Sequence, residues 1–182
     1  MGRRYLALLV LGAFLSLSAS VEAKDRSVVR SLSEAIPVLP TGSVRTCTQE
    51  DLLGNWQLIR FDSPYQFRDP YAPYLLPHQV FQYSKDGAVK SAHSARPIAG
   101  SPDQVFDAIP LAMSYRMRLG GIVTLVKNGD DRVVETWRCA AVTGAQQDPD
   151  QQVAMKRGDL VMTLIGKQGQ VVFVRHLRKV AA

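Results

Sequence analysis

The sequence predicts an all-β protein, an eight-stranded antiparallel up-and-down β-barrel with one short helix, preceded by a cleaved N-terminal signal peptide. The first observation is a series of short apolar-alternating runs, most of them separated by tight-turn residues, from Cys47 to the C-terminal end. The second is that no long stretch has the 3.6-residue period of a helix. Eight runs are enough to close a small barrel, and closure removes exposed sheet edges.

The first 23 residues have the organisation of a secretory signal peptide. Arg3 and Arg4 precede an apolar run from Leu6 to about Ala19, and the small-residue pattern 21–23 follows. The run is shorter than the roughly 18 residues of a membrane-spanning helix, so we expect cleavage and a secreted or periplasmic protein. An uncleaved N-terminal anchor is the alternative. Cleavage removes two arginines and one glutamate, which lowers the formal net charge from +6 to +5.

Residues 24–46 form a polar, proline-punctuated leader, in which a short helix over 28–36 is expected to end before Pro37. The barrel domain is expected to cover residues 47–182. Its two cysteines, Cys47 and Cys139, are the only ones in the sequence. In an oxidising compartment a single disulfide between them is the expected state, because neither belongs to a close-spaced pair that would suit zinc.

The expected strands follow in order along the domain, and turn residues separate most of them. Asp86-Gly87 and Asn128-Gly129 are typical of hairpin turns. The clearest period-two pattern is in 111–119, where Leu111, Met113, Tyr115, Met117 and Leu119 are predicted to face inward. The eight expected strands are residues 53–61, 79–83, 88–92, 111–119, 122–126, 132–142, 160–165 and 170–179.

A short helix interrupts the meander after the third run. Ser101, Pro102 and Gln104 have the spacing of a capping box with proline at the first helical position. The helix is expected over Val105, Phe106 and Ile109, and it either caps the mouth of the barrel or fills a gap in the core.

Gly54-Asn55-Trp56, at the head of the first strand, resembles the G-x-W signature of lipocalins, and the strand order of residues 47–179 is similar to theirs. Because the chain lacks a T-D-Y-like motif, it resembles a divergent bacterial lipocalin-like domain rather than a typical lipocalin. The resemblance implies that Gly54 and Trp56 form the barrel floor. It also implies that an arginine of the last strand stacks on the indole, with Arg175 the first candidate and Arg178 the second.

The resemblance also implies binding of a small hydrophobic or amphipathic molecule, or a lipid, inside the barrel, without a cofactor. The alternative is an interior filled by its own side chains. The candidate ligand-binding residues are Met113, Tyr115, Met117, Trp137 and Met162.

A rival hypothesis is an envelope interaction module with a filled barrel. The loop 62–77 carries four aromatic and four proline residues, and it is either a lid over the open end, a partner-binding surface or a segment that folds back onto the barrel. Together with a basic last strand it would bind an envelope protein or an anionic membrane surface. Nucleic acid is not expected as a partner, because no Lys/Arg run is interleaved with stacking aromatics. The basic residues are Arg175, His176, Arg178 and Lys179.

The sequence supports neither a metal site nor a catalytic centre. No two histidines have the spacing of a metal-ligand pair, although His78 and His93 lie on one expected hairpin whose register stays open. Common hydrolase, metalloprotease and nucleotide-binding motifs do not occur. Asp130, Asp131 and Glu135 lie at or near a turn, where solvated acids are expected. We therefore assign no catalytic residue and no metal ligand.

Overall fold

The computed structural model describes residues 43–67, 69, 71–145 and 154–180. The expected signal peptide (1–23), the leader up to residue 42 and its short helix lie outside the described residues. Within the described part, no helix has both the length and the apolar character needed to cross a membrane.

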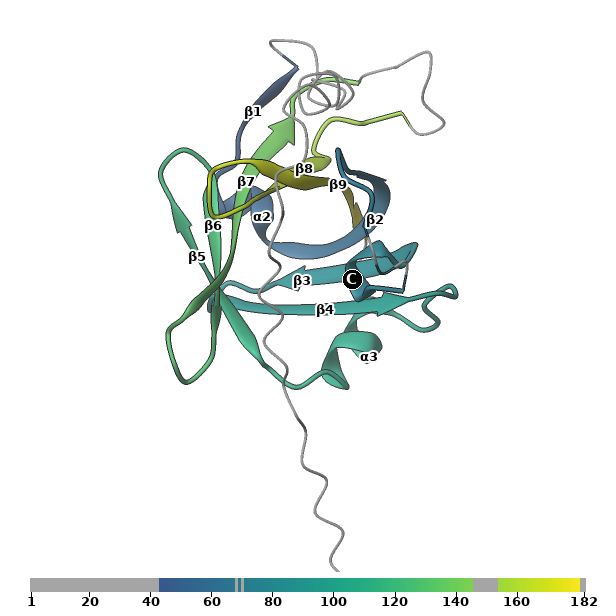
Figure 1. Ribbon diagram of the computed structural model, residues 1–182. Coiled ribbons are helices and arrows are strands. Elements are labelled where there is room, and N and C mark those ends of the chain that lie inside the picture. The colour runs from purple at the N-terminus through teal and green to yellow at the C-terminus, as the bar shows by residue number, and fades with distance from the viewer. Residues whose placement is uncertain (1–42, 68, 70, 146–153, 181–182) are drawn as a thin grey trace, which may run out of the picture.

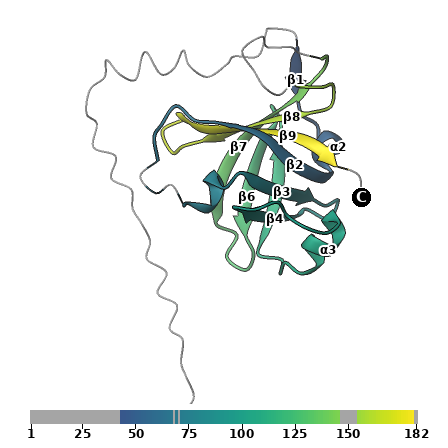
Figure 2. The same cartoon turned by 90° about the vertical axis from the view of Figure 1, so that its right-hand side faces the viewer.

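Eight antiparallel strands form a closed barrel, which confirms the predicted fold (Figures 1 and 2). Each strand pairs with its neighbours in sequence, and the pairing of the first with the last closes the sheet. All eight expected runs are strands, with small shifts at their ends. The barrel strands are β2 (Gly54–Asp62), β3 (His78–Tyr83), β4 (Ala88–Ser94), β5 (Met113–Arg118), β6 (Ile122–Lys127), β7 (Val133–Val142), β8 (Leu160–Ile165) and β9 (Val171–Val180).

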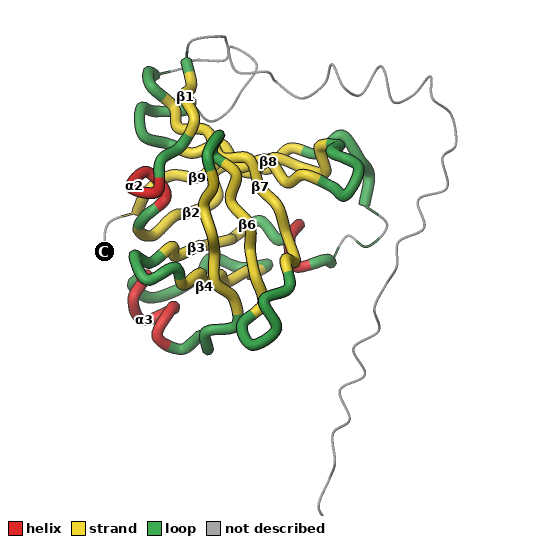
Figure 3. Tube along the Cα trace, turned by 90° about the vertical axis from the view of Figure 1, so that its left-hand side faces the viewer, coloured by secondary structure: helices red, strands yellow, loops and turns green. Residues whose placement is uncertain are grey.

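A further short strand, β1 (Val44–Thr46), lies on the edge of β7 beyond the point where β6 ends (Figure 3). Cys139 is at this junction: its N–H donates to Gly121 O at 2.8 Å, and its carbonyl accepts from Cys47 N at 3.2 Å. A side chain at Gly121 would place its Cβ 2.5 Å from Cys139 O, and the φ of +69° there also favours glycine. The predicted Cys47–Cys139 disulfide is present.

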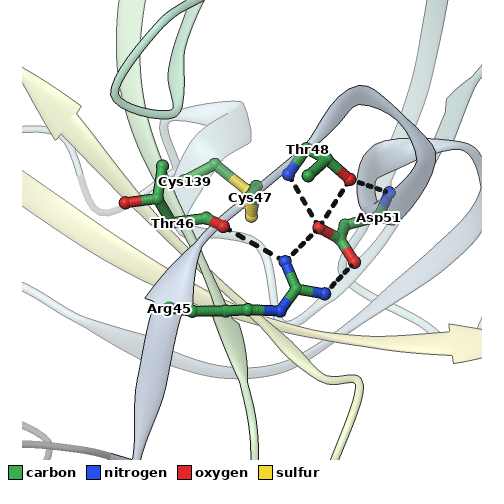
Figure 4. A network of polar contacts seen from close by, with 6 residues as sticks. All are labelled: Arg45, Thr46, Cys47, Thr48, Asp51 and Cys139. Carbon is green, nitrogen blue, oxygen red and sulfur yellow. Dashed lines mark hydrogen bonds and ion pairs between the residues drawn. A yellow bond between two sulfur atoms is a disulfide. The ribbon is translucent and has the colours of Figure 1, made fainter.

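The short helix α2 (Gln49–Leu52) follows the disulfide and is fixed by a polar network (Figure 4). Thr48 and Asp51 form a capping box, and the two terminal guanidinium nitrogens of Arg45 donate to the Asp51 carboxylate at 2.6 Å each. The hydrogen bonds from Arg45 lower the pKa of Asp51 well below its ordinary value. This network connects β1 to the segment that leads into the barrel.

Trp56, in β2, is buried at the end of the barrel where α2 enters. Its side chain is 1% exposed, and its indole N–H donates to Leu52 O at 2.8 Å. Further along β2, a bulge between Leu58 and Arg60 shifts the register against β9. The extra residue restores Phe61 to the inside, where its ring contacts Phe173 at 4.9 Å. The bulge explains the irregular alternation of this run in the sequence.

The structure corrects the expected inward orientation of Leu111 and Leu119, and it shows where the expected short helix lies. Leu111 and Leu119 do not face inward: they are 50% and 99% exposed, because β5 begins at Met113 and ends at Arg118. The helix α3 (Pro102–Asp107), with the predicted capping box at Ser101, packs beside β4 and does not cap the mouth (Figure 1). Only the first two residues of β4 pair with β5, and α3 lies beside the part of β4 that follows them. The Lys90 ammonium donates to Phe106 O at 2.8 Å.

Replacement of Trp56 by alanine should lower the free energy of unfolding by about 3–5 kcal/mol, because a fully buried indole and its hydrogen bond are lost. Urea denaturation followed by circular dichroism measures the change. Leu119→Ala, at a side chain that is 99% exposed, is the control and should change stability by less than about 0.5 kcal/mol. A loss below about 1 kcal/mol for Trp56→Ala would contradict a structural role for the indole.

Removal of the disulfide should also destabilise the barrel, because it joins residues separated by 92 positions. The double variant Cys47→Ser/Cys139→Ser is expected to lose about 4–5 kcal/mol in the chain-entropy model. Denaturation of the wild type with and without a reducing agent provides the control: the reductant should reproduce the loss in the wild type and leave the double variant unchanged. Equal midpoints for the oxidised and reduced wild type would refute the prediction.

Candidate binding site inside the barrel

A cluster of aromatic rings fills the end of the barrel opposite α2. Phe173, from β9, is at its centre and contacts Trp137 at 5.4 Å and Tyr74 at 5.8 Å between ring centroids. The rings of Tyr74 and Phe173 are nearly parallel, at 8°, whereas Trp137 meets Phe173 edge-on. Phe61 and Phe67 complete the cluster. The strands β2, β7 and β9 thus direct their inward rings to one place.

Arg175, the next inward residue of β9 after Phe173, is buried among these rings with only 8% of its surface exposed. Its guanidinium carbon lies 4.8 Å from the Phe81 ring centroid, 4.9 Å from that of Trp137 and 5.1 Å from that of Phe173. Such cation–π contacts are worth roughly 0.5–2 kcal/mol each. They hold the guanidinium in a defined position inside the barrel.

Within the part of the chain that the structure describes, no carboxylate contacts the charge of Arg175 directly. Arg175 takes part in none of the ion pairs found within the described ranges, and its Nε has no hydrogen-bond acceptor there. Burial lowers the pKa of Arg175, while the neighbouring Tyr83 and Glu135 act in the opposite direction. The Glu135 carboxylate accepts the Trp137 indole N–H at 2.8 Å. The interior therefore holds a cation that is solvated mainly by aromatic faces.

The cation over Trp56 differs from the one that the resemblance implied. The structure places Lys179 there, with its Nζ 5.6 Å from the ring centroid. Arg178, the second candidate, forms an ion pair with Asp159 at 2.7 Å on another side of the strand. Strand alternation places Lys179 opposite Trp56 on the inner face and Arg178 on the outer face. Arg175 also faces inward, but it lies four residues before Lys179 and reaches the ring cluster instead.

The aromatic loop covers this end of the barrel. Phe67 and Tyr74 pack on the ring cluster, whereas Tyr65 and Tyr71 remain 44% and 83% exposed. The loop includes the one-turn helix η1 (Pro73–Leu75). We call residues 71–76 the lid segment, because their backbone carbonyls bind side chains that line the barrel mouth.

Gln79 and His93 make these bonds. The Gln79 amide donates to Tyr74 O and to Leu76 O, both at 2.8 Å, and His93 Nδ1 lies 3.0 Å from Pro73 O. The two residues are direct partners in the β3–β4 register, so their side chains share the inner face. His78 pairs with Ser94 and lies on the other face, which answers the question that the sequence left open.

The surroundings of His93 favour its neutral form. Burial and the neighbouring charge of Arg175 lower its pKa, although the bond to Pro73 O opposes them. Since a carbonyl can only accept, Nδ1 carries the proton and Nε2 is left as an acceptor. Among the described residues, no group of three or more histidine, cysteine or acidic side chains could hold a metal ion.

The five residues proposed from the sequence as ligand contacts fall into two groups. Trp137 and Met162 lie with Arg175 around the same interior space, together with Phe81, Tyr83 and Leu177. Tyr115 is buried elsewhere, against the Tyr83 ring, and donates to Ser84 O. Met113 and Met117 are only partly buried against the core. The space around Arg175 leaves no room for a water-sized sphere, so the interior is filled as it stands.

Four further interior residues were not predicted from the sequence: Gln79, Phe81, Tyr83 and Phe173. A signal was present, because Gln79, Phe81 and Tyr83 alternate in β3 in the same period-two pattern as β5. The polar Gln79 obscures this pattern in the sequence, because glutamine is usually found at the surface, whereas Gln79 is 1% exposed.

The basic last strand is largely used within the fold. His176 Nε2 lies 2.8 Å from Asp62, which also accepts from Arg60 at 2.9 Å. Burial alone would raise the pKa of Asp62, but these two bonds outweigh burial and the pKa is below its ordinary value. His176 is 3% exposed. The strand therefore does not present a continuous basic surface.

The lowered pKa of His93 predicts a pH dependence of stability. The unfolded chain takes up a proton near the ordinary pKa of 6.5, whereas the folded chain resists it. The resulting stabilisation is present above pH 6.5 and is lost as the pH falls through the lower folded pKa. Urea denaturation between pH 7.5 and about 5 should show that His93→Phe removes part of the wild-type slope. His78→Phe is the matched control and should keep that slope; equal slopes for wild type and His93→Phe would contradict the assignment.

Comparison with known proteins adds no assignment to this geometry. No family model, curated protein or solved structure matches the chain. The closed eight-stranded barrel is consistent with a lipocalin-like fold, and membership of that family stays a proposal.

Proposed function

We propose that the protein is an exported lipocalin-like barrel that binds a small amphipathic molecule with an acidic group in its interior. The observation that carries the proposal is Arg175, a buried cation that has no carboxylate in direct contact among the described residues and lies within about 5 Å of three aromatic ring centroids. A buried guanidinium is costly unless an anion neutralises it. An acidic ligand would supply that anion.

The surroundings of Arg175 suit the rest of such a ligand. Trp137, Phe173 and Met162 offer apolar and polarisable surface on the sides of the guanidinium. A ligand site of this kind combines mostly apolar walls with a few polar groups that set the orientation. The carboxylate would bind at Arg175, and the apolar body would replace contacts that the aromatic rings now make with one another.

Entry requires movement, because the interior leaves no water-sized space around Arg175. The lid segment is the element best placed to move. Its attachment consists of Tyr74 on the ring cluster and the bonds from Gln79 and His93, while Tyr71 extends into solvent. Displacement of the lid segment would open a path to Phe173 and then to Arg175.

Two features support export. Residues 1–23 have the pattern of a signal peptide, and the two cysteines form a disulfide. Disulfides persist in oxidising compartments and are rare in the cytosol. We therefore propose a secreted or periplasmic location, which N-terminal sequencing of the protein purified from its host would test.

The filled interior favours a second candidate, an envelope interaction module. Tyr65 and Tyr71 are exposed on the aromatic loop and could contact an envelope protein or an anionic membrane surface. The last strand contributes little to such a surface, because Arg175 and His176 are buried and Arg178 is paired with Asp159. The ligand hypothesis is preferred, since it accounts for the buried cation.

The proposal predicts that the affinity for an acid depends on Arg175. Isothermal titration calorimetry with octanoate and 1-octanol compares two ligands that differ in the acidic group. Arg175→Met should weaken octanoate binding roughly 10- to 100-fold, the value of a charge-assisted hydrogen bond, and should change 1-octanol binding little.

The matched control is Arg118→Met, at an exposed arginine of β5, which should leave both affinities unchanged. Absence of octanoate binding to the wild type, or equal affinity of wild type and Arg175→Met, would count against an interior acid site. Binding to anionic vesicles that is lost in a Tyr65→Ser/Tyr71→Ser variant would favour the interaction module instead.

A further inference from the structure

Three buried polar atoms around the ring cluster have no hydrogen-bond partner among the residues that the structure describes. They are Nε of Arg175, Oε1 of Gln79 and Nε2 of His93. Buried polar groups are nearly always hydrogen-bonded, so each unpartnered one needs an explanation. A fourth such atom, Nδ1 of His176, belongs to a residue on the outer face of β9, bonded to Asp62.

The three atoms belong to one region of the interior. Gln79 and His93 are directly opposite each other in the β3–β4 pair, and the His93 ring contacts Phe81 at 5.7 Å. The Arg175 guanidinium lies over that same Phe81 ring, and its charge acts on His93. The Phe81 ring therefore contacts both Arg175 and His93, and Gln79 faces His93 across the hairpin.

The lid segment determines which atoms of Gln79 and His93 are left over. Both hydrogens of the Gln79 amide group point to lid carbonyls, so Oε1 must face elsewhere and can only accept. His93 donates from Nδ1 to Pro73 O, so Nε2 of the neutral ring can also only accept. Each side chain holds the lid segment with one end and presents an acceptor with the other.

We propose that the ligand head group carries a hydrogen-bond donor beside its acidic group, as a 2-hydroxy acid does. The inference rests on the proposed function, because it concerns the same interior site. The carboxylate binds Arg175, and the adjacent hydroxyl donates to His93 Nε2 or Gln79 Oε1. A plain acid would leave both acceptors without a donor, which is costly in a buried site.

The test compares 2-hydroxyoctanoate with octanoate by isothermal titration calorimetry. The wild type should bind the hydroxy acid about three- to tenfold more tightly, the range expected for one neutral hydrogen bond. In the double variant Gln79→Met/His93→Phe, the ratio of the two affinities should fall to about one.

Two control variants separate recognition from lid stability. Tyr74→Leu removes a stacking contact of the lid segment and should change both affinities by the same factor, leaving the ratio intact. His78→Phe alters the outer face of the same hairpin and should change neither. A merely structural role of Gln79 and His93 would likewise change both affinities together.

Each outcome of these titrations tests a different part of the proposal. Equal affinities of the wild type for the two acids would overturn the head-group inference and leave the acid site in place. A hydroxy-acid preference that survives in the double variant would overturn the assignment to Gln79 and His93. Failure of both acids to bind would overturn the inference together with the proposed function.

Discussion

The pairing of β2 with β9 is the interaction on which the rest of the molecule depends. It joins the first and last barrel strands, and its register places Phe61 opposite Arg175. The bulge between Leu58 and Arg60 keeps both side chains on the inner face after Trp56 and Leu58 have already been placed there. Without that one extra residue, every side chain of β2 beyond the bulge would point to the opposite face. The pairing of β2 with β9 therefore closes the barrel and also determines which side chains of these two strands face its interior.

Burial of Arg175 removes water both from its charge and from its N–H donors. The three aromatic faces recover part of the lost hydration, but a guanidinium has five N–H donors and aromatic faces satisfy them poorly. A methionine would pack there with a smaller penalty, as replacement of buried charges in other proteins indicates. The sequence nevertheless has arginine at this position. The most direct physical account is a role that requires the charge.

Periodicity predicted the fold well, because alternation and turn residues are local properties that a single sequence displays. The eight strands followed from it. The Ser101 capping box followed from the spacing of its residues, and the Cys47–Cys139 pair from the cysteine count and the expected compartment. The site was predicted less well. Trp137 and Met162, predicted as interior residues, lie in the interior beside Arg175, but the positions of Gln79 and His93 depend on a cross-strand register and on a loop that returns to the barrel. Both are long-range features, and residue types alone do not encode them. Leu119 shows that local alternation can also mislead, because the period-two pattern of the sequence continues past the last residue of β5.

The position of the disulfide has a consequence for the order in which the molecule matures. Cys47 precedes β2 and Cys139 lies within β7, so most of the barrel is between them in the chain. A polypeptide that emerges from its amino end cannot form the covalent link until about three-quarters of its length is exposed, and β8 and β9 follow later still. Oxidation can then link the segment that contains β1 and α2 to a sheet that still lacks β8 and β9. Docking of the final two strands, which brings Arg175 inside, is left as the closing step of assembly.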